Sequence, residues 1–255
     1  MTKMLLLRVY LDTNQFYGGY YSPIHDNGCI TFLPIKEVHQ LREIPSHLNA
    51  IKIIDKCTNM PLSMFYPREW VINNKLAVHN DPRLDLGFYT GHYAPIGRIP
   101  RRLARNDYIL FMAGLAKYRA GFWDKPRSKS EIIKAFKEAK DKGNAGIYIV
   151  AYIKVNDIVE IKNWLQAIKK YPNLKYSPHY YWEDTQRITV AVIGESNYII
   201  PPIKIFDLKE KKPTRVLVDL IGKENTVRLI KNNFRKSRLI IMDSEQIENL
   251  IESLK

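Results

Sequence analysis

Two polar side chains separated by one residue are the strongest candidates for chemistry in this sequence. They are the histidine and the aspartate of the segment His79-Asn80-Asp81-Pro82. An imidazole and a carboxylate at this spacing can act as an acid/base pair or supply half of a hard-metal site. Asp12, which follows a buried apolar run, is a further candidate carboxylate. The structural alternative is a turn, because Asp before Pro is ordinary turn chemistry. We assign no metal ligands at this point.

A second group of candidates mixes aromatic and basic side chains. Aromatic side chains stack on bases, and the arginine guanidinium forms bidentate hydrogen bonds with phosphate. The mixture therefore suits a single-stranded or flipped-out nucleotide. In the alternative interpretation the aromatic rings belong to the core and the arginines are solvated. The predicted substrate-binding residues are Tyr89, His92, Arg98, Arg101, Arg102 and Trp123.

The segment His179-Tyr180-Tyr181-Trp182 is the third candidate. We expect it to lie in a strand, where successive side chains point to opposite faces and at least one ring is exposed or lines a groove. Stacking on a base is the functional interpretation, and an aromatic flank on an ordinary sheet is the structural one.

The positive charge is concentrated in two segments. The net charge is +14. Residues 98–142 hold 13 Lys and Arg against 5 Asp and Glu, residues 209–238 hold 10 against 3, and the remainder holds 17 against 18. Such clustering is typical of proteins that bind a polyanion, because neutralised phosphates release counterions. A generic solvated basic surface and an anionic membrane surface are the alternatives.

The sequence argues against several classes of enzyme and against a membrane-spanning or secreted protein. The motifs GxxxxGK[ST], GxGxxG, HExxH and GxSxG are absent, and no motif names a cofactor. The longest charge-free apolar run, Gly146 to Ile153, is too short for a bilayer, and Arg8 and Asp12 interrupt a secretory signal. Two cysteines, Cys29 and Cys57, indicate neither a disulfide framework nor a zinc site. We therefore expect a reducing, cytoplasmic setting.

The hydrophobic pattern predicts an α+β fold with a mixed, partly barrel-like sheet and flanking helices, because strands come in groups without regular β-α alternation. Helices are expected over about 129–142, where Ser128 and Glu131 form a capping box, and over 156–170, 224–234 and from Ser244. The expected strands are Met4–Leu11, Cys29–Ile35, Tyr108–Met112, Gly146–Val155, Ile188–Ile193, Ile203–Phe206, Thr214–Leu220 and Arg238–Met242, with a further short strand over Ala50–Ile54.

Four spaced blocks of the first 155 residues resemble the third type of the nucleotide-modification-associated domain families. They are VYLDTNQFYGGYYSPIHDNG…FLPI, HNDPRLDLGFYTG, RRLARNDYILFMAGL and GIYIVAYIKV, and they stand in family order. The resemblance implies a part in nucleotide or DNA base modification. The matching polar positions are Asp12, Gly18, Gly19, His79, Asp81, Arg102 and Asp107. A looser similarity, carried by Leu103, Asp107 and the strand 108–111, is to modified-base-reading barrels of the PUA and EVE kind.

These observations lead to one functional hypothesis and two alternatives. We expect an intracellular protein that binds nucleic acid or a nucleotide and takes part in recognising or processing modified bases, without a membrane partner. The first alternative is a catalytically active base-modifying enzyme. The second is a non-enzymatic protein that binds an acidic protein partner. We expect residues 1–207 to form the α+β domain and residues 208–255 a basic appendage packed on the same body.

Overall fold

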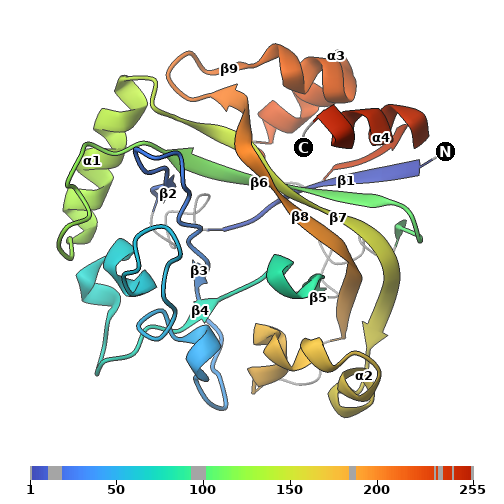
Figure 1. The fold of residues 1–255 in the computed structure, drawn as a ribbon, viewed down its shortest axis with the longest axis horizontal. Coiled ribbons are helices and arrows are strands. Elements are labelled where there is room, and N and C mark those ends of the chain that lie inside the picture. Colours follow the sequence, from blue (N-terminus) through green and yellow to red (C-terminus); the bar gives the residue numbers. More distant parts are fainter. Residues whose placement is uncertain are drawn as a thin grey trace.

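The fold is taken from a computed structural model of the chain. It describes residues 2–10, 19–92, 102–183, 188–232, 234, 238–242 and 244–253. Figure 1 shows helices α3 (Arg215–Lys231) and α4 (Ser244–Ser253) on one side of a central sheet. Helix α2 (Trp164–Lys170) and the paired strands β3 (Ile35–Lys36) and β4 (Val78–His79) lie on the other side (Figure 1). None of the described helices has the length and apolar character that crossing a bilayer requires.

The central sheet has eight strands and mixed pairing. β1 pairs in parallel with β6 and β6 pairs in parallel with β2, whereas the other pairs are antiparallel. In spatial order the main strands are β10 (Arg238–Met242), β1 (Thr2–Arg8), β6 (Tyr108–Ala116), β7 (Ala145–Ile161), β8 (Thr189–Asp207) and β5 (Phe88–His92). β2 (Ser22–Pro23) adds to β6 and β9 (Lys212–Pro213) adds to β8. The predicted α+β fold with a mixed sheet is confirmed, and the described strands do not close into a barrel.

Alternation of side chains explains why residues 4–7 of β1 and the whole of β6 are apolar. Met4 and Leu6 on one face join a core cluster with Leu217 of α3 and Ile247 of α4. Leu5 on the opposite face belongs to a different cluster. Because successive side chains of a strand point to opposite faces, a strand covered on both faces needs apolar residues at every position. β6 is accordingly buried at all nine positions.

The helices and the second sheet complete the molecule. α1 covers a cluster built largely from the irregular segment between residues 20 and 78, and α2 covers the end of β7 and β8. The α-helices are α1 (Lys129–Asp141), α2 (Trp164–Lys170), α3 (Arg215–Lys231, interrupted at Gly222) and α4 (Ser244–Ser253). β3 (Ile35–Lys36) and β4 (Val78–His79) form a separate antiparallel pair. Short 3₁₀ helices span Ser46–Leu48, Leu62–Phe65, Arg68–Trp70, Leu84–Leu86, Pro172–Tyr176 and Pro178–Tyr181.

Several segments take a different secondary structure from the predicted one. The expected strands over residues 29–35 and 50–54 are irregular, apart from isolated bridges and Ile35 in β3. Residues 157–161 were expected in a helix, but they extend β7 because they pair with β8, as Ile158 does with Val192. The helix begins only at Trp164. Its N-cap is Asn163, whose side chain accepts a hydrogen bond from the N–H of Gln166. Residues 214–220 were expected in a strand and instead open α3. Pairing with β8 keeps residues 157–161 extended, in agreement with their β-branched content. Burial of Leu217 and Leu220 in the core instead accompanies a helix that the β-branched residues of 214–220 do not favour.

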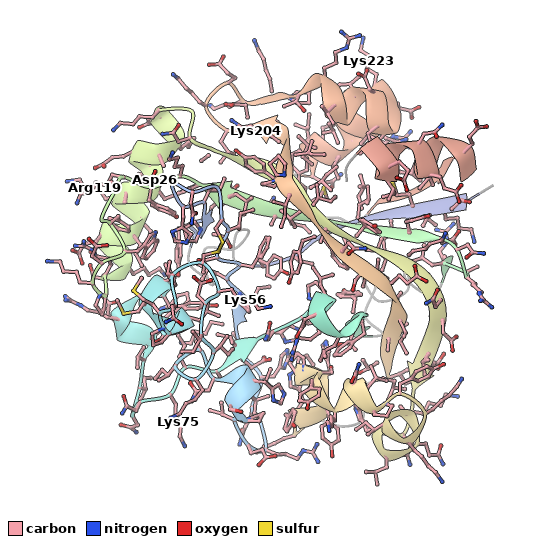
Figure 2. The ribbon with its side chains drawn as sticks, viewed as in Figure 1. Asp26, Lys56, Lys75, Arg119, Lys204 and Lys223 are labelled. Carbon is pink, nitrogen blue, oxygen red and sulfur yellow. A yellow bond between two sulfur atoms is a disulfide. The ribbon has the colours of Figure 1, made fainter. Side chains whose placement is uncertain are left out.

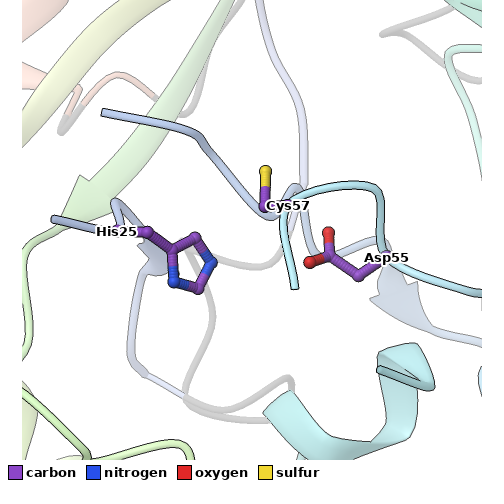
Figure 3. A group of neighbouring side chains, drawn as sticks. All are labelled: His25, Asp55 and Cys57. Atoms are coloured by element: carbon purple, nitrogen blue, oxygen red, sulfur yellow. The ribbon is translucent and has the colours of Figure 1, made fainter. Parts of the chain in front are cut away.

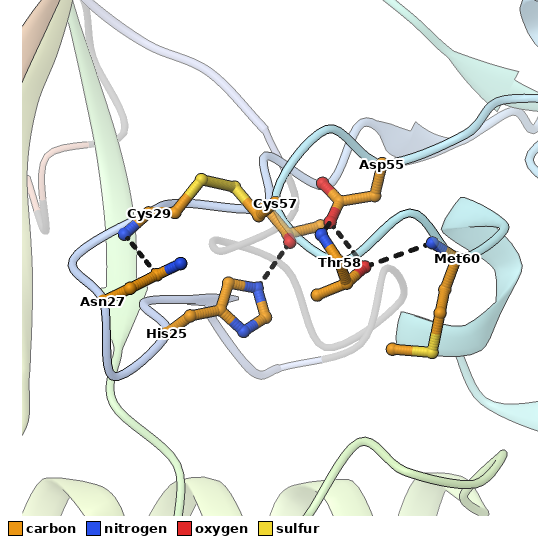
Figure 4. Close-up of a disulfide and its surroundings, with 8 residues drawn as sticks. His25, Asn27, Cys29, Asp55, Cys57, Thr58 and Met60 are labelled. Carbon is orange, nitrogen blue, oxygen red and sulfur yellow. Dashed lines mark hydrogen bonds between the residues drawn. A yellow bond between two sulfur atoms is a disulfide. The ribbon is translucent and has the colours of Figure 1, made fainter.

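The prediction for the cysteines was wrong, because Cys29 and Cys57 are joined by a disulfide. Figure 4 shows the bond linking two turns that are ordered locally, one by the Asn27 side chain and the other by the Asp55 carboxylate, which accepts hydrogen bonds from Thr58. The reducing setting was inferred from unpaired cysteines, and it therefore loses that support.

Two glycines bring β8 against the loop that leads into β5, and this contact gives a testable prediction. A Cβ added at Gly194 would lie 2.0 Å from the carbonyl oxygen of Lys154, and the N–H of Gly194 donates to the carbonyl of Gly87. Gly194→Ala is therefore expected to lower the free energy of unfolding by about 3 kcal/mol, because backbone cannot move aside cheaply. Urea denaturation measures this change.

The control for this prediction is Gly28→Ala. A Cβ at Gly28 meets nothing within 4 Å, and only its positive φ of 80° opposes the substitution. The expected cost is about 1 kcal/mol. Equal losses in the two variants would contradict the packing argument.

Candidate functional site

Three titratable side chains from two distant segments meet at one point. His79 ends β4, Asp81 follows it, and His179 lies in the 3₁₀ helix Pro178–Tyr181. Each of the three offers one nitrogen or carboxylate oxygen, and these atoms all lie within 4.8 Å of one another. The His79–Asp81 segment and the segment that begins at His179 were separate candidates in the sequence, and the structure brings them into one cluster.

Glu37 orients the His79 ring. Nδ1 of His79 lies 2.9 Å from Oε2 of Glu37, and Nε1 of Trp182 donates to the same oxygen over 3.2 Å. Burial works to raise the pKa of Glu37, but the hydrogen bonds from His79, the His39 backbone and Trp182 outweigh it, and the pKa is lowered. Glu37 is therefore a buried carboxylate, held in its ionised form by its neighbours.

Asp81 is held by Thr90 of β5. Oδ2 of Asp81 accepts hydrogen bonds from the backbone N–H and the hydroxyl of Thr90, and that hydroxyl lies 2.9 Å from the hydroxyl of Ser177. Burial raises the pKa of Asp81 to about 6, against the opposing influence of His79, Thr90 and Arg83. The carboxyl group therefore changes charge near neutral pH, a property that is common at functional sites.

Aromatic rings enclose the two histidines. The His79 and His179 rings are 4.7 Å apart between centroids and nearly perpendicular, and the Trp182 ring lies 4.5 Å from that of His179. The His39 ring also contacts Trp182, with centroids 3.8 Å apart. The His79 side chain is 22% exposed, whereas that of Asp81 is 1% exposed. His79 is therefore the member of the cluster that contacts solvent.

Arg83 lies beside the cluster. Two of its nitrogens donate to the Asp85 carboxylate, over 2.9 and 2.7 Å, and its guanidinium lies over the Tyr176 ring. Within the part of the chain that the structure describes, Nη1 of Arg83 is buried and has no hydrogen-bond partner. The same is true of Nε2 of His47, whose pKa is lowered to about 4 by burial and by Arg83.

The pKa of His47 predicts a loss of stability in mild acid. The folded pKa of about 4 is below the ordinary value of 6.5. Between these pH values the imidazole binds a proton in the unfolded chain but not in the folded chain. Between these values stability falls as the pH falls, and above pH 6.5 this group has no effect. Allowing for solvent screening of a half-buried ring, we expect about 1–2 kcal/mol between pH 7 and pH 4.5.

The measurement is urea denaturation at both pH values for the wild type and His47→Gln. The difference between the two proteins isolates this imidazole from the carboxylates that titrate in the same range. A variant that loses as much stability in acid as the wild type would rule out His47 as the source.

The remaining predicted substrate-binding residues are spread over the molecule. Tyr89 of β5 faces Phe111 in the core, and burial together with the charge of Asp81 raises its pKa. Trp123 is 7% exposed and packs against other aromatic rings of the α1 cluster. Arg102 is exposed, and its carbonyl accepts a hydrogen bond from Lys3. His92 ends β5, and its side chain is not among those described. Asp12, Arg98 and Arg101 lie outside the described residues.

A second group of three possible metal ligands is already engaged in other bonds. Figure 3 shows His25, Asp55 and Cys57 close together. The Cys57 sulfur belongs to the disulfide, Nε2 of His25 lies 2.7 Å from the Thr31 hydroxyl, and Asp55 accepts hydrogen bonds from Thr58. A thiolate is the form of cysteine that binds metals, and the disulfide removes it. This group therefore serves the loop structure.

The two basic segments meet at one side of the molecule. The turn between β8 and β9 lies against the end of α1, where the N–H of Leu208 donates to the carbonyl of Ala145. A Cβ added at Gly143 would lie 3.6 Å from the Lys209 side chain. Exposed lysines from both segments gather here, namely Lys142, Lys209, Lys211 and Lys212. Figure 2 shows Arg119 at the edge of the molecule near α1, Lys204 on β8 and Lys223 on α3. We call the four lysines the basic junction.

Several residues of the cluster gave no signal in the sequence. Glu37 follows Lys36 in an unremarkable polar stretch and is 42 residues from His79. Thr90 and Ser177 are ordinary hydroxyl residues whose contact joins positions 87 residues apart. His179 was noted only as part of an aromatic strand, but Ser177 instead caps a 3₁₀ helix there. Only long-range packing assembles these groups.

Comparison with known proteins gives one match. Residues 3–239 match the family described as nucleotide modification associated domain 3. Among curated proteins and solved structures, none matches the chain.

Proposed function

The chain belongs to the nucleotide modification associated domain 3 family, and from this premise we propose that it binds nucleic acid or a nucleotide and recognises or processes a modified base. One observation carries the proposal. The cluster of His79, Asp81 and His179 combines two imidazoles and a buried carboxylate with one solvent-exposed side. Such convergence of polar groups within aromatic walls is typical of a ligand site.

The base would meet the cluster through His79 and Asp81. These side chains supply a hydrogen-bond donor and acceptor for the polar edge of a base, and edge contacts are what distinguish one base from another. The exposed part of His79 is where a base would enter. A base flipped out of its strand fits this arrangement better than a paired one, because pairing in a duplex occupies the Watson–Crick edge.

Arg83 is suited to hold the phosphate of the same nucleotide. Its guanidinium is fixed by Asp85 and Tyr176, and its side chain is 13% exposed. A fixed guanidinium loses little entropy when it binds phosphate. The predicted phosphate ligands Arg98, Arg101 and Arg102 and the predicted stacking residues Tyr89 and Trp123 stay predictions alongside it.

The basic junction would hold the rest of a nucleic-acid strand. It gathers exposed lysines from the two segments that carry the excess charge. If it contacts phosphates, affinity for DNA or RNA falls steeply with salt, because bound phosphates release counterions. The first experiment is therefore binding of short single- and double-stranded DNA and RNA at two salt concentrations. Absence of binding at low salt would contradict the nucleic-acid proposal.

Charge reversal at the basic junction tests where the strand binds. Lys142→Glu, Lys209→Glu and Lys212→Glu combined are expected to weaken binding about 10- to 100-fold near 0.1 M salt and to reduce the salt slope by about 2 to 3. The matched control carries the same charge change at exposed lysines elsewhere, Lys52→Glu, Lys75→Glu and Lys162→Glu. Equal effects of the two triple variants would mean that only net charge matters.

Two further candidate functions are an enzyme and an interaction protein. The His79→Ala variant tests the first, and binding to an acidic protein tests the second. If the protein is an enzyme, which the buried cluster favours, the substitution leaves affinity nearly intact and abolishes turnover. If it only recognises a base, affinity falls and no product forms. Binding to a phosphate-free acidic protein with the same salt dependence as DNA would support an interaction protein instead.

A further inference from the structure

The cluster around Asp81 has the spacing of a metal site. Nε2 of His179 lies 3.7 Å from Oδ2 of Asp81, and the ligand atoms of His79, Asp81 and His179 lie within 4.8 Å of one another. Two atoms that bind one ion at about 2.1 Å in tetrahedral geometry are about 3.4 Å apart. The three side chains therefore need only small movements to share one ion.

The orientation of His79 is a second argument. Its Nδ1 is hydrogen-bonded to Glu37, and the Glu37 carboxylate is itself fixed by the backbone N–H groups of Val38 and His39. Histidines that bind metals commonly donate one ring N–H to a carboxylate in this way, which fixes the tautomer and leaves the other nitrogen for the ion. Nε2 of His79 is thus the nitrogen left for coordination.

Charge is a third argument. The side chains of Glu37 and Asp81 are 2% and 1% exposed, and the histidines beside them carry charge only when protonated. Arg83 is near, but it is already paired with Asp85. Carboxylates taken out of water are costly unless hydrogen bonds and a cation compensate them, and the described residues supply hydrogen bonds alone here. A bound divalent ion would supply that charge at the centre of the cluster.

We propose that His79, Asp81 and His179 bind one divalent transition-metal ion, with Glu37 as the partner that orients His79. Two imidazoles and one carboxylate are a ligand set that zinc and non-haem iron use, and three protein ligands leave positions for water or substrate. The exposed side of His79 is where those positions open. The metal site stands by itself, but its use on a nucleotide rests on the proposed function.

The test is direct metal binding by the full chain. The protein is treated with a chelator, dialysed and titrated with Co²⁺, whose visible absorption reports coordination, and Zn²⁺ is then added in competition. We expect one Co²⁺ per chain, its displacement by Zn²⁺, and a rise in melting temperature with either ion, since a ligand that binds only the folded state stabilises it.

Variants locate the site. His79→Gln and His179→Gln are each expected to weaken binding at least about 100-fold, and Glu37→Gln about 10- to 100-fold, the usual effect of losing an outer-shell partner. The matched control is His25→Gln in the second histidine group, which should bind Co²⁺ as the wild type does. Circular dichroism shows which variants are folded, and His79, the more exposed ligand, gives a variant that should fold even if His179→Gln does not.

Two results would overturn the proposal. One is a folded wild-type protein that binds neither Co²⁺ nor Zn²⁺. The other is a folded His79→Gln variant that binds Co²⁺ as tightly as the wild type. Oligonucleotide binding by the metal-free protein is measured in parallel. Retained oligonucleotide binding without metal binding would end the metal proposal alone, and metal binding without oligonucleotide binding would end only the proposed function.

Discussion

A Cys29→Ser/Cys57→Ser variant is expected to lose about 3.6 kcal/mol of unfolding free energy at 25 °C. The disulfide joins residues 28 apart in the sequence, and opening a loop of that size returns about this much chain entropy to the unfolded state. Urea denaturation of the double variant and of the oxidised wild type measures the difference. The wild type treated with a reductant should give the same midpoint as the variant.

The control for the disulfide is Thr58→Val. It removes the hydroxyl hydrogen bond to Asp55 beside the bridge and keeps the bridge itself. We expect a loss of about 1 kcal/mol, the net value of one hydrogen bond. If the double serine variant loses no more than Thr58→Val does, the bridge contributes little to stability and the cysteines are held together by packing alone.

Glu37→Ala is expected to cost about 3–5 kcal/mol of unfolding free energy, the usual effect of removing one member of a buried charged network. The Glu37 carboxylate accepts hydrogen bonds from His79, Trp182 and two backbone N–H groups, and alanine leaves these donors without an acceptor. The loss should show in thermal unfolding as well as in urea.

Glu37→Gln keeps half of these hydrogen bonds. The amide oxygen of glutamine can accept from one of the two pairs of donors, but its NH2 group faces the other pair, so we expect a loss of about 2–3 kcal/mol, smaller than that of alanine. A Glu37→Ala variant as stable as Glu37→Gln would show that water or repacking satisfies the donors, and the carboxylate would then not be the element that fixes His79.

The parts of the fold that depend on neighbours in sequence could be predicted. The capping box of Ser128 and Glu131 was read from four residues, and both of its hydrogen bonds are present at the start of α1. The strand beginning at Tyr108 was recognised because an uninterrupted apolar run fits burial on both faces. Local chemistry and burial of whole segments leave clear marks in a single sequence.

The parts that depend on distant partners could not be predicted. Whether residues 157–161 continue a strand is decided by pairing with β8, some thirty residues later. The Cys29–Cys57 bond likewise depends on two turns being brought together. At the candidate site, residue types alone directed attention to His79 and Asp81, but nothing local indicates that Glu37 and His179 lie against them.

Because these residues are far apart in the sequence, the cluster can assemble only late in the synthesis of the chain. The hydrogen bond between Trp182 and Glu37 spans 145 residues. Contacts of this range form late, because the chain must close a long loop before it gains from them. A ribosome that has released only the first 170 residues exposes His79 and Asp81 without His179 or Trp182. Partly made chains therefore carry an incomplete cluster, and only chains that have passed this point can assemble it.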